Sequence, residues 1–292
     1  MEKLSISMIL NKLRNLIMPK VTLVGAGGKM GLRLTSNLIR SNHKISYLEV
    51  NPVGILKLKE KGVTVCSEEE CIPGADIVIL AVPDVALERV SGNIIPRMKK
   101  GSMVITLDPA AALAGKLFHR DDISYFVTHP THPSIFNWEP DREAMNDHFG
   151  GTAARQAIVC ALMKGNEKDY KKGEELARIF YAPVSKAHRI TVEQMGLLEP
   201  ALVETLASTC VYVIRMGLDE VISRGVPAEA ARDFLLGHLR NQMAVLFDEL
   251  PGAVFSDAAN KALARGLQEF IKDDWKKVFD QDNVMDQIKS IT

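Results

Sequence analysis

The sequence has no excess of charge of either sign and is poor in cysteine. Its 292 residues contain 36 Lys and Arg and 36 Asp and Glu, so the formal net charge is zero. Non-specific nucleic-acid binding draws its affinity from surplus Lys and Arg, so we expect no nucleic-acid partner. Four scattered cysteines without a C-x-x-C pair exclude a disulfide scaffold and favour free thiols in a reducing, cytoplasmic compartment: Cys66, Cys71, Cys160 and Cys210.

Long hydrophobic runs are missing as well. Runs such as residues 77–82 are far shorter than the ~20 residues that span a bilayer, so we expect no membrane-spanning helix and no membrane partner. Residues 1–17 are apolar, but Lys12 and Arg14 interrupt them and no small-residue cleavage site follows, so they make a poor signal peptide, and Met18 is an alternative start. With 47% hydrophobic and 25% charged residues, the composition is typical of an ordered globular protein.

Short apolar strands alternate with helical stretches in the first part of the chain. We expect strands over residues 20–24, 45–50, 63–66, 76–82, 104–107, 125–128 and 156–163, and helices over residues 32–41 and 167–181. The strands are continuous apolar runs, as is typical of strands buried on both faces of a parallel sheet. The pattern predicts an α/β Rossmann domain with a doubly wound, mostly parallel sheet over residues 18–184.

The character of the chain changes after Pro183. Residues 191–215, 228–248 and 257–291 have helical spacing of apolar residues, and no strand signal follows the proline. We therefore expect an all-α domain over residues 185–292 that serves substrate binding or dimerisation. Its apolar composition favours a homodimer, although a buried monomeric core would have the same composition.

A glycine-rich turn joins the first expected strand to the first helix. Gly25 allows a tight turn, Gly27 or Gly28 lets the backbone approach a pyrophosphate, and Gly31 allows close packing of helix on strand. The spacing is G-x-x-G-x-x-G rather than the usual G-x-G-x-x-G. The strand before and the helix after the turn favour a dinucleotide site, whose pyrophosphate would lie at the helix N-terminus. We assign cofactor contacts here to Gly25, Ala26, Gly27, Gly28, Lys29, Met30 and Gly31.

Further cofactor contacts follow from the ends of the other strands. Glu49 ends the second strand, where a carboxylate accepts hydrogen bonds from both hydroxyls of the adenosine ribose and repels a 2′-phosphate. NAD is therefore favoured over NADP, although Lys57 and Lys59 lie close in sequence and an ordinary solvated Glu would look the same. The next two strand ends are expected to border the nicotinamide side, through Val82, Pro83, Asp84 and Asp108.

Two histidines stand at the carboxyl end of a later strand, in the stiff segment Thr-His-Pro-Thr-His-Pro that spans residues 128–133. Ligands bind at this edge of an open α/β sheet, and imidazole titrates near neutral pH, so His129 or His132 is a candidate acid, base or hydrogen-bond donor. The alternative is a structural loop with one satisfied and one exposed histidine. Two histidines alone do not make a metal site.

A second polar cluster opens the helical part. The cluster lies in residues 188–204, which are otherwise strongly apolar, and we place it on a helical wheel. Its charged residues would line a cleft, because isolated buried charges are costly. The alternative is that the acidic residues Glu193 and Glu199 pair with Arg189 or with a partner subunit. Pro200 lies inside this segment and predicts a kink. The candidate substrate-binding or catalytic residues here are His188, Arg189, Glu193 and Gln194.

These motifs resemble the superfamily of 6-phosphogluconate and β-hydroxyacid dehydrogenases, in which an NAD(P)-binding domain precedes a helical one. The resemblance rests on residues 25–31, on residues 75–83 and on the helical half, and it covers nearly all residues from Met18. Residues 188–205 and 233–239 are similar to a narrower phosphogluconate-dehydrogenase-like group that includes apionate oxidoisomerases. That likeness implies NAD-linked oxidation of a small polyhydroxy acid, coupled to a carbon shift.

One departure from the superfamily changes the expected chemistry. The β-hydroxyacid enzymes carry a catalytic lysine at the start of the interdomain helix, whereas no Lys occurs over residues 187–215 and Glu193 and Gln194 stand in that neighbourhood. We therefore expect that His129 takes the hydroxyl proton, or that His129 and Glu193 hold a divalent metal ion. Arg189 is the expected partner of the substrate carboxylate.

Three other functions stay open. The His-Pro turn is similar to that of prephenate dehydrogenases, and an imine or ketol-acid reductase would use the same cofactor domain with reduced coenzyme. A non-catalytic NAD-binding regulator would bind NAD without turnover. The number of ionisable groups favours an enzyme over such a regulator.

Overall fold

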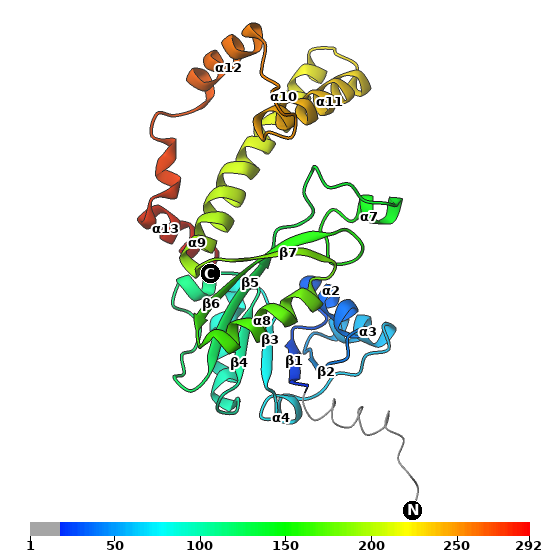
Figure 1. The fold of residues 1–292 in the computed structure, drawn as a ribbon, viewed down its shortest axis with the longest axis vertical. Helices are drawn as coiled ribbons and strands as arrows, with labels where there is room; N and C mark the ends of the chain where they lie inside the picture. The colour runs from blue at the N-terminus through cyan, green and yellow to red at the C-terminus, as the bar shows by residue number, and fades with distance from the viewer. Residues whose placement is uncertain (1–17) are drawn as a thin grey trace, which may run out of the picture. The chain divides into compact units, whose positions relative to one another are not determined.

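The computed structural model describes residues 18–292, so the expectations about residues 1–17 concern a segment outside this range. Seven strands form one sheet in the order β2-β1-β3-β4-β5-β6-β7 (Figure 1). Strands β1 to β5 are parallel, whereas β6 runs antiparallel to β5 and parallel to β7. This confirms the predicted α/β class with a mostly parallel sheet. The strand bounds are β1 Lys20–Val24, β2 Lys44–Leu48, β3 Ile77–Leu80, β4 Met103–Thr106, β5 Ser124–Pro130, β6 Gln156–Lys164 and β7 Val184–Arg189.

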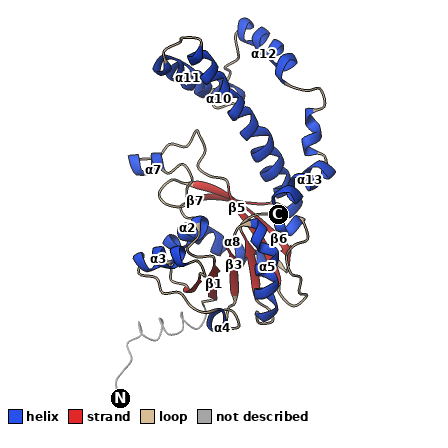
Figure 2. Ribbon diagram, turned by 180° about the vertical axis from the view of Figure 1, so that it is seen from behind, coloured by secondary structure: helices blue, strands red, loops and turns tan. Residues whose placement is uncertain are grey.

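Helices cover both faces of the sheet, as Figure 2 shows. Alternate residues of β3 belong to two separate cores, and all four are at most 1% exposed. One core contains side chains of α2 (Lys29–Leu38), α3 (Pro52–Glu60) and α8 (Glu167–Phe180). The other contains side chains of α4 (Glu68–Cys71), α5 (Asp84–Ile94), α6 (Ala110–Leu113) and α9 (Val192–Gly196). Burial on both faces explains why these strands are continuous apolar runs.

The order of the strands reverses at β1. This strand pairs with β2 on one side and with β3 on the other, in register Val24↔Leu48 and Val24↔Leu80. In open α/β sheets a ligand crevice forms outside the carboxyl ends of the strands where the order reverses. The fold therefore puts the crevice at the ends of β1 and β3.

Two local expectations were wrong. Residues 63–66 do not form a strand, since only an isolated bridge joins Val65 to Tyr47. Conversely, β7 follows Pro183 and extends the sheet by one edge strand. The side chains of β7 are exposed or half-buried and mostly polar, so the strand has no apolar run by which it could be predicted.

By its contacts the described chain divides into two units. Unit 1 comprises residues 18–196 together with Met285–Thr292, and unit 2 comprises Leu197–Val284. Strand β7 and helix α9 belong to unit 1, although they lie beyond residue 184, where we placed the domain boundary. The end of α13 (Gln281–Ile291) is anchored in unit 1, where Ile288 is buried and Lys116 Nζ donates a hydrogen bond of 2.7 Å to the Thr292 carbonyl oxygen.

Unit 2 is entirely helical but buries very little. It contains η2 (Leu197–Ala207), α10 (Ser208–Ser223), α11 (Ala228–Leu246), α12 (Asp257–Phe270) and η3 (Trp275–Phe279). None of the residues of α10 or α12 is buried, and α11 buries Ala231 alone. Pro200, where we expect a kink, lies inside the π-helical segment η2, whose wider hydrogen-bonding pattern accommodates a residue without an N–H.

The helical run Val192–Ser223 corrects one exclusion. Over 32 residues, with a window of mean hydropathy 1.5, it is long and apolar enough to cross a bilayer by length and composition. The sequence shows no long uninterrupted apolar run here, because Glu193, Glu199 and Glu204 interrupt it. The mean hydropathy of the segment is nevertheless high. Core helices of soluble proteins pass the same test, so this single helix is weak evidence for a membrane.

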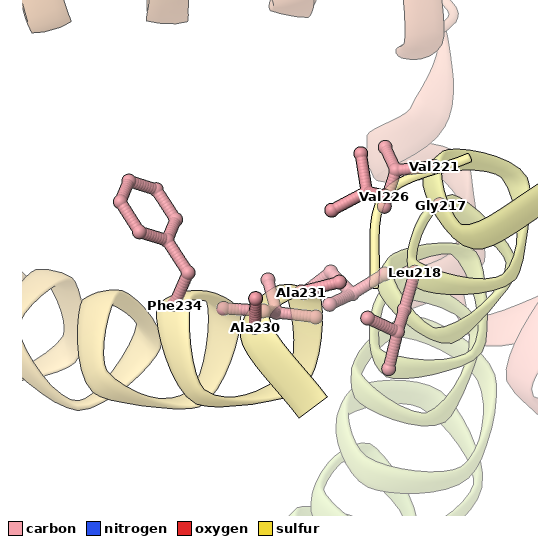
Figure 3. A pocket seen from close by; sticks show the side chains of 9 residues that line it. Gly217, Leu218, Val221, Val226, Ala230, Ala231 and Phe234 are labelled. Carbon is pink, nitrogen blue, oxygen red and sulfur yellow. The ribbon is translucent and has the colours of Figure 1, made fainter. Parts of the chain in front are cut away.

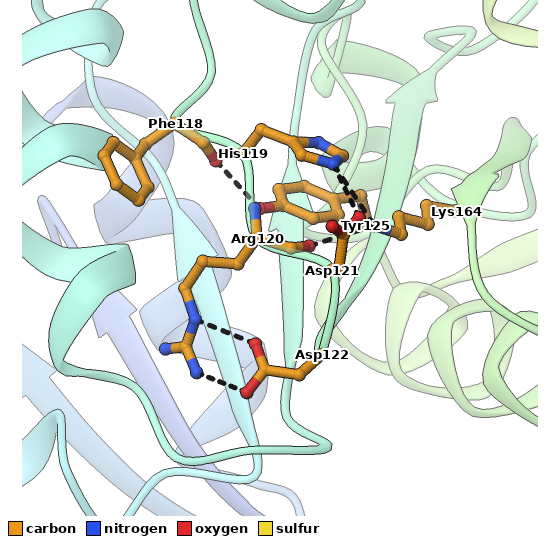
Figure 4. A network of polar contacts seen from close by, with 7 residues as sticks. All are labelled: Phe118, His119, Arg120, Asp121, Asp122, Tyr125 and Lys164. Carbon is orange, nitrogen blue, oxygen red and sulfur yellow. Dashed lines mark hydrogen bonds and ion pairs between the residues drawn. The ribbon is translucent and has the colours of Figure 1, made fainter.

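The other end of the sheet carries a polar network (Figure 4). Arg120 pairs with Asp122 and donates to the carbonyl oxygens of Ile95 and Met98, and Tyr125 Oη donates to the Phe118 carbonyl oxygen. Lys164, Asp121 and His119 contact one another at the surface. Because these groups satisfy one another at the amino end of β5, we interpret the network as structural.

Candidate functional site

The turn between β1 and α2 has the geometry of a phosphate-binding loop. Gly25 has φ +76°, and a Cβ there would lie 2.5 Å from the Ala81 carbonyl oxygen. A Cβ on Gly31 would overlap the Gly25 carbonyl oxygen. Side chains at these two positions would push the helix away from the strands, so the glycines bring the α2 N-terminus to the end of β1.

Glu49 lies directly after β2 and is held by backbone amides. Its Oε2 accepts a hydrogen bond of 2.8 Å from Gly27 N, and its Oε1 accepts from Val50 N and Asn51 N at 2.9 and 2.8 Å. A carboxylate offers about four acceptor sites, so these three bonds leave room for roughly one more. The carboxylate is fixed beside the glycine turn, and it has acceptor capacity left for a ribose hydroxyl.

A cavity of about 330 Å³ opens at the carboxyl ends of β1, β3, β4 and β5. Eight of the predicted site residues line it, from the glycine turn to the first histidine, so residues far apart in sequence converge where the strand order reverses. The lining residues are Gly28, Lys29, Met30, Leu80, Ala81, Val82, Pro83, Asp84, Leu87, Leu107, Asp108 and His129.

His129 presents one ring nitrogen to this cavity in a defined state. Its Nδ1 lies 2.8 Å from the Pro130 carbonyl oxygen. A carbonyl can only accept, so Nδ1 carries the proton and Nε2 of the neutral ring carries the lone pair. Nε2 lies 3.9 Å from Asp108 Oδ2, while Asp108 Oδ1 accepts a hydrogen bond of 2.7 Å from Ala110 N. His129 Nε2 can therefore take up a proton beside a carboxylate.

Asp84 adds a third ionisable group to the cavity wall, at the first residue of α5. Burial and the nearby charge of Asp108 together raise the pKa of Asp84 to about 6, while a backbone hydrogen bond and His129 act in the opposite direction. Carboxyl groups with raised pKa values cluster at functional sites. The cavity thus combines two carboxylates, one of them protonated more easily than usual, with one imidazole.

His132 does not line the cavity. It has a positive φ of 58°, its Nδ1 donates 2.8 Å to the Phe149 carbonyl oxygen, and its ring stands edge-on to His129 with centroids 6.3 Å apart. These contacts tie the loop after β5 to residue 149. Through these contacts His132 lies between Phe149 and His129.

The second predicted cluster lies elsewhere. His188 and Arg189 are exposed on the edge strand β7, and Arg189 pairs with Glu167 at 2.7 Å and stacks over Tyr170 at 4.0 Å. Gln194 accepts from Thr191 N and donates its own N–H to Thr191 Oγ1, which is a helix cap. The helical wheel assumed one helix from residue 188, whereas β7 extends to Arg189. Within the described residues, none of these side chains lines the cavity of about 330 Å³.

The structure also separates the predicted metal pair, His129 and Glu193, because the segment before Glu193 is a strand and not a helix. Glu193 is exposed at the start of α9, where a backbone hydrogen bond at its own position and the Thr191 hydroxyl lower its pKa. His129 is instead next to Asp108, which we had expected to contact cofactor only. An imidazole and a carboxylate are suitable ligands for a divalent cation. The position of Asp108 at the end of β4, beside β5, was the sequence signal for this pair.

Comparison with known proteins covers the whole described chain. A model of the phosphogluconate dehydrogenase (decarboxylating) C-terminal domain matches residues 137–292, and a model of coenzyme F420-dependent NADP oxidoreductases matches residues 20–124. A D-apionate oxidoisomerase from Cupriavidus necator is 50% identical over 274 residues, which cover 94% of this chain and 99% of the relative. One from Rhizobium rhizogenes is 49% identical over 94% of this chain and 100% of the relative.

A solved structure agrees with these relatives. The crystal structure of a semialdehyde dehydrogenase NAD-binding protein from Cupriavidus necator, in complex with calcium and NAD, matches with a TM-score of 0.92 and 49% identity. The match covers 94% of this chain and 100% of that chain. The fold and the sequence thus point to the same set of relatives.

Proposed function

The chain belongs to the phosphogluconate dehydrogenase (decarboxylating) C-terminal domain family, together with its D-apionate oxidoisomerase relatives, and on this premise we propose that it is itself an NAD-dependent D-apionate oxidoisomerase. The observation that carries the proposal is the 50% identity over 94% of the chain. The cavity supports it, because an oxidoisomerase needs a dinucleotide and a group that removes a hydroxyl proton, and both have candidate residues there.

The residues present fit NAD. NAD supplies the hydride acceptor when bound. The N–H groups of Lys29 and Met30 at the α2 N-terminus would hold its pyrophosphate, because the other N–H groups of the turn already donate to Leu48, Glu49 and Gly25. Glu49 would accept a hydrogen bond from a ribose hydroxyl and would repel a 2′-phosphate. This repulsion would favour NAD over NADP.

His129 is the proposed base for the hydroxyl group that is oxidised. Hydride removal from the carbinol carbon requires that the hydroxyl proton leaves, and His129 Nε2 would accept it. The hydrogen bond from Nδ1 to the Pro130 carbonyl keeps Nε2 available for that proton. Asp108, at 3.9 Å, would stabilise the imidazolium that forms.

Asp108 and His129 would also fit a divalent cation, with further ligands from substrate oxygens. Such a cation, when bound, supplies Lewis acidity that polarises a hydroxyl or carbonyl oxygen. One lone pair on Nε2 cannot hold a proton and a cation together, so the two roles of His129 exclude each other. Activity that survives exhaustive chelation would assign the proton to His129, and strict dependence on added calcium or magnesium would assign the cation. Glu193→Gln is the control for the metal pair that we predicted from sequence.

The direct test is oxidation of D-apionate with NAD. We expect reduced nicotinamide to appear and carbon NMR to show a product with a rearranged skeleton. Prephenate with NAD, and imines or ketol acids with NADPH, serve as comparison substrates. Turnover of one of those in place of D-apionate would contradict the proposal, as would NAD binding without turnover of any hydroxy acid.

We further propose that the protein is a cytoplasmic homodimer joined through unit 2. Large apolar side chains are exposed along α10, α11 and α12, among them Tyr212, Phe234 and Phe270. Phe234 is one of the residues of α10, α11 and their connection that border an apolar cavity of about 560 Å³ (Figure 3). Exposed apolar surface of this extent marks an interaction face. The free thiols among the described residues agree with a reducing compartment.

A further inference from the structure

The proposed substrate is a carboxylate, and the expected cation for it is engaged elsewhere. Arg189 is paired with Glu167 and stacked on Tyr170. The wall of the catalytic cavity contains two carboxylates, Asp84 and Asp108, which repel an anion. Lys29 is the cation among the lining residues. An anionic substrate in this cavity therefore needs Lys29 or a group next to it.

Lys29 and Arg33 form a pair of cations on one aromatic ring. They lie four residues apart on α2, so their side chains share one face of the helix. Lys29 Nζ is 5.2 Å and Arg33 Cζ is 4.3 Å from the centroid of the Phe149 ring. Among residues 18–292 neither cation makes an ion pair with a carboxylate.

This arrangement is unfavourable for the helix by itself. Like charges four residues apart repel each other, and cations near a helix N-terminus oppose the helix dipole. The first turn of α2 contains no acidic residue that would compensate. Among residues 18–292, the attraction seen for both cations is that of the Phe149 ring face. Local rules broken in this way, beside a cavity, indicate that the compensating anion is a ligand.

Phe149 connects this pair to the catalytic histidine. Its carbonyl oxygen accepts the hydrogen bond from His132 Nδ1, and its ring contacts the His132 ring at 5.8 Å. The His132 ring in turn contacts His129 at 6.3 Å. The cations are held at a defined place relative to the proposed base.

We propose that Lys29 and Arg33, supported on the ring of Phe149, form the subsite that binds the substrate carboxylate. The proposal rests on the proposed function. A pair of cations binds oxyanions in general, and both the substrate carboxylate and the pyrophosphate of the dinucleotide are oxyanions. The experiment must therefore separate the hydroxy acid from the cofactor as the source of the anion.

The test compares D-apionate with its neutral primary amide in Lys29→Met, Arg33→Met and the wild type. Binding is measured by calorimetry on the complex with NADH, which cannot accept a hydride from the substrate, and KM and kcat are measured with NAD. We expect Lys29→Met to weaken D-apionate binding by about tenfold to a hundredfold, as for one lost charge-assisted hydrogen bond, and to leave amide binding unchanged. KM should rise and kcat at saturation should change little. Lys29→Arg should restore most of the preference for the acid.

The control variant is Lys61→Met, which removes an exposed lysine that donates to Ser36 on the same helix. It should leave the preference for the acid unchanged. Weakened NAD binding in Lys29→Met, with an unchanged preference for acid over amide, would overturn the proposal and assign the cations to the pyrophosphate. An unchanged preference and unchanged NAD binding would also overturn it. Binding of D-apionate is measured without turnover, so failure of the proposed reaction is distinguishable from failure of the subsite.

Discussion

Apolar residues are frequent in both unit 1 and unit 2, but the two units bury them to different extents. In unit 1 the apolar strands lie between two layers of helices, with β3 at most 1% exposed. In unit 2 the helices α10 and α12 bury none of their residues. Unit 1 therefore contains its own core and presents ionisable groups at one edge, whereas unit 2 lacks a core of its own within the described chain. This difference is the basis of our proposals that unit 1 provides the chemistry and unit 2 the dimer interface.

The largest effect that tests this division is expected at His129. His129→Asn removes the nitrogen that takes the hydroxyl proton and should lower kcat by about 10²- to 10⁴-fold. NAD affinity, measured by calorimetry, should stay within about twofold, because the turn and Glu49 are untouched. The matched control is His119→Asn in the surface network, which should keep wild-type turnover. Full activity of His129→Asn would remove this residue from the mechanism.

The next variant addresses unit 2. Phe234→Asp places a charge on an apolar side chain that is 70% exposed, and it should shift the protein from dimer to monomer in analytical ultracentrifugation. Moving an unpaired charge from water into an apolar interface is unfavourable in free energy, so the dimer would be destabilised. Ile39→Asp, at an exposed apolar position of unit 1, is the control and should leave the sedimentation coefficient unchanged. A wild-type monomer would break the comparison between the units.

Glu49→Gln tests cofactor choice with a smaller expected effect. The substitution removes the negative charge that repels a 2′-phosphate and keeps the shape of the side chain. We expect the ratio of NADP to NAD dissociation constants to fall by about tenfold, the equivalent of ~1.4 kcal/mol. Calorimetric titration with both dinucleotides measures the ratio. An unchanged ratio would mean that another group sets the preference.

The smallest effect concerns the pH dependence of stability. The pKa of Asp84 is raised to about 6 by burial and by Asp108, above its ordinary value, so its ionisation costs stability as the pH rises through that range. In the presence of chelator, Asp84→Asn should be more stable than the wild type by about 1 kcal/mol above pH ~7, allowing for partial solvent exposure. The gain should shrink toward pH ~4. Urea denaturation at both pH values measures it, and a pH-independent gain would contradict the cause assigned here.

The parts of the site that sequence could predict are those set by local geometry. The Gly25–Gly31 turn, Glu49 and the strand ends at Asp84, Asp108 and His129 follow from strands buried on both faces and from backbone positions that admit only glycine. Their convergence follows from the reversal of strand order at β1.

The remaining parts depend on contacts that no local pattern records. Strand β7 is an exposed edge strand without an apolar run, so His188 and Arg189 were placed on a helix. The cation pair on Phe149 joins residues more than a hundred positions apart. The exposed apolar faces of unit 2 have no covering element among residues 18–292, so no sequence pattern shows what lies against them.

The most direct test of the account is a crystal structure of the complex with NAD and D-apionate. We predict that the pyrophosphate lies on the turn of residues 25–31 and that His129 Nε2 is within about 2.6–3.2 Å of a substrate hydroxyl or of a cation bound to it. A dinucleotide outside the cavity bordered by Gly28, Pro83 and Asp108, or a His129 ring without contact to substrate or cation, would contradict it.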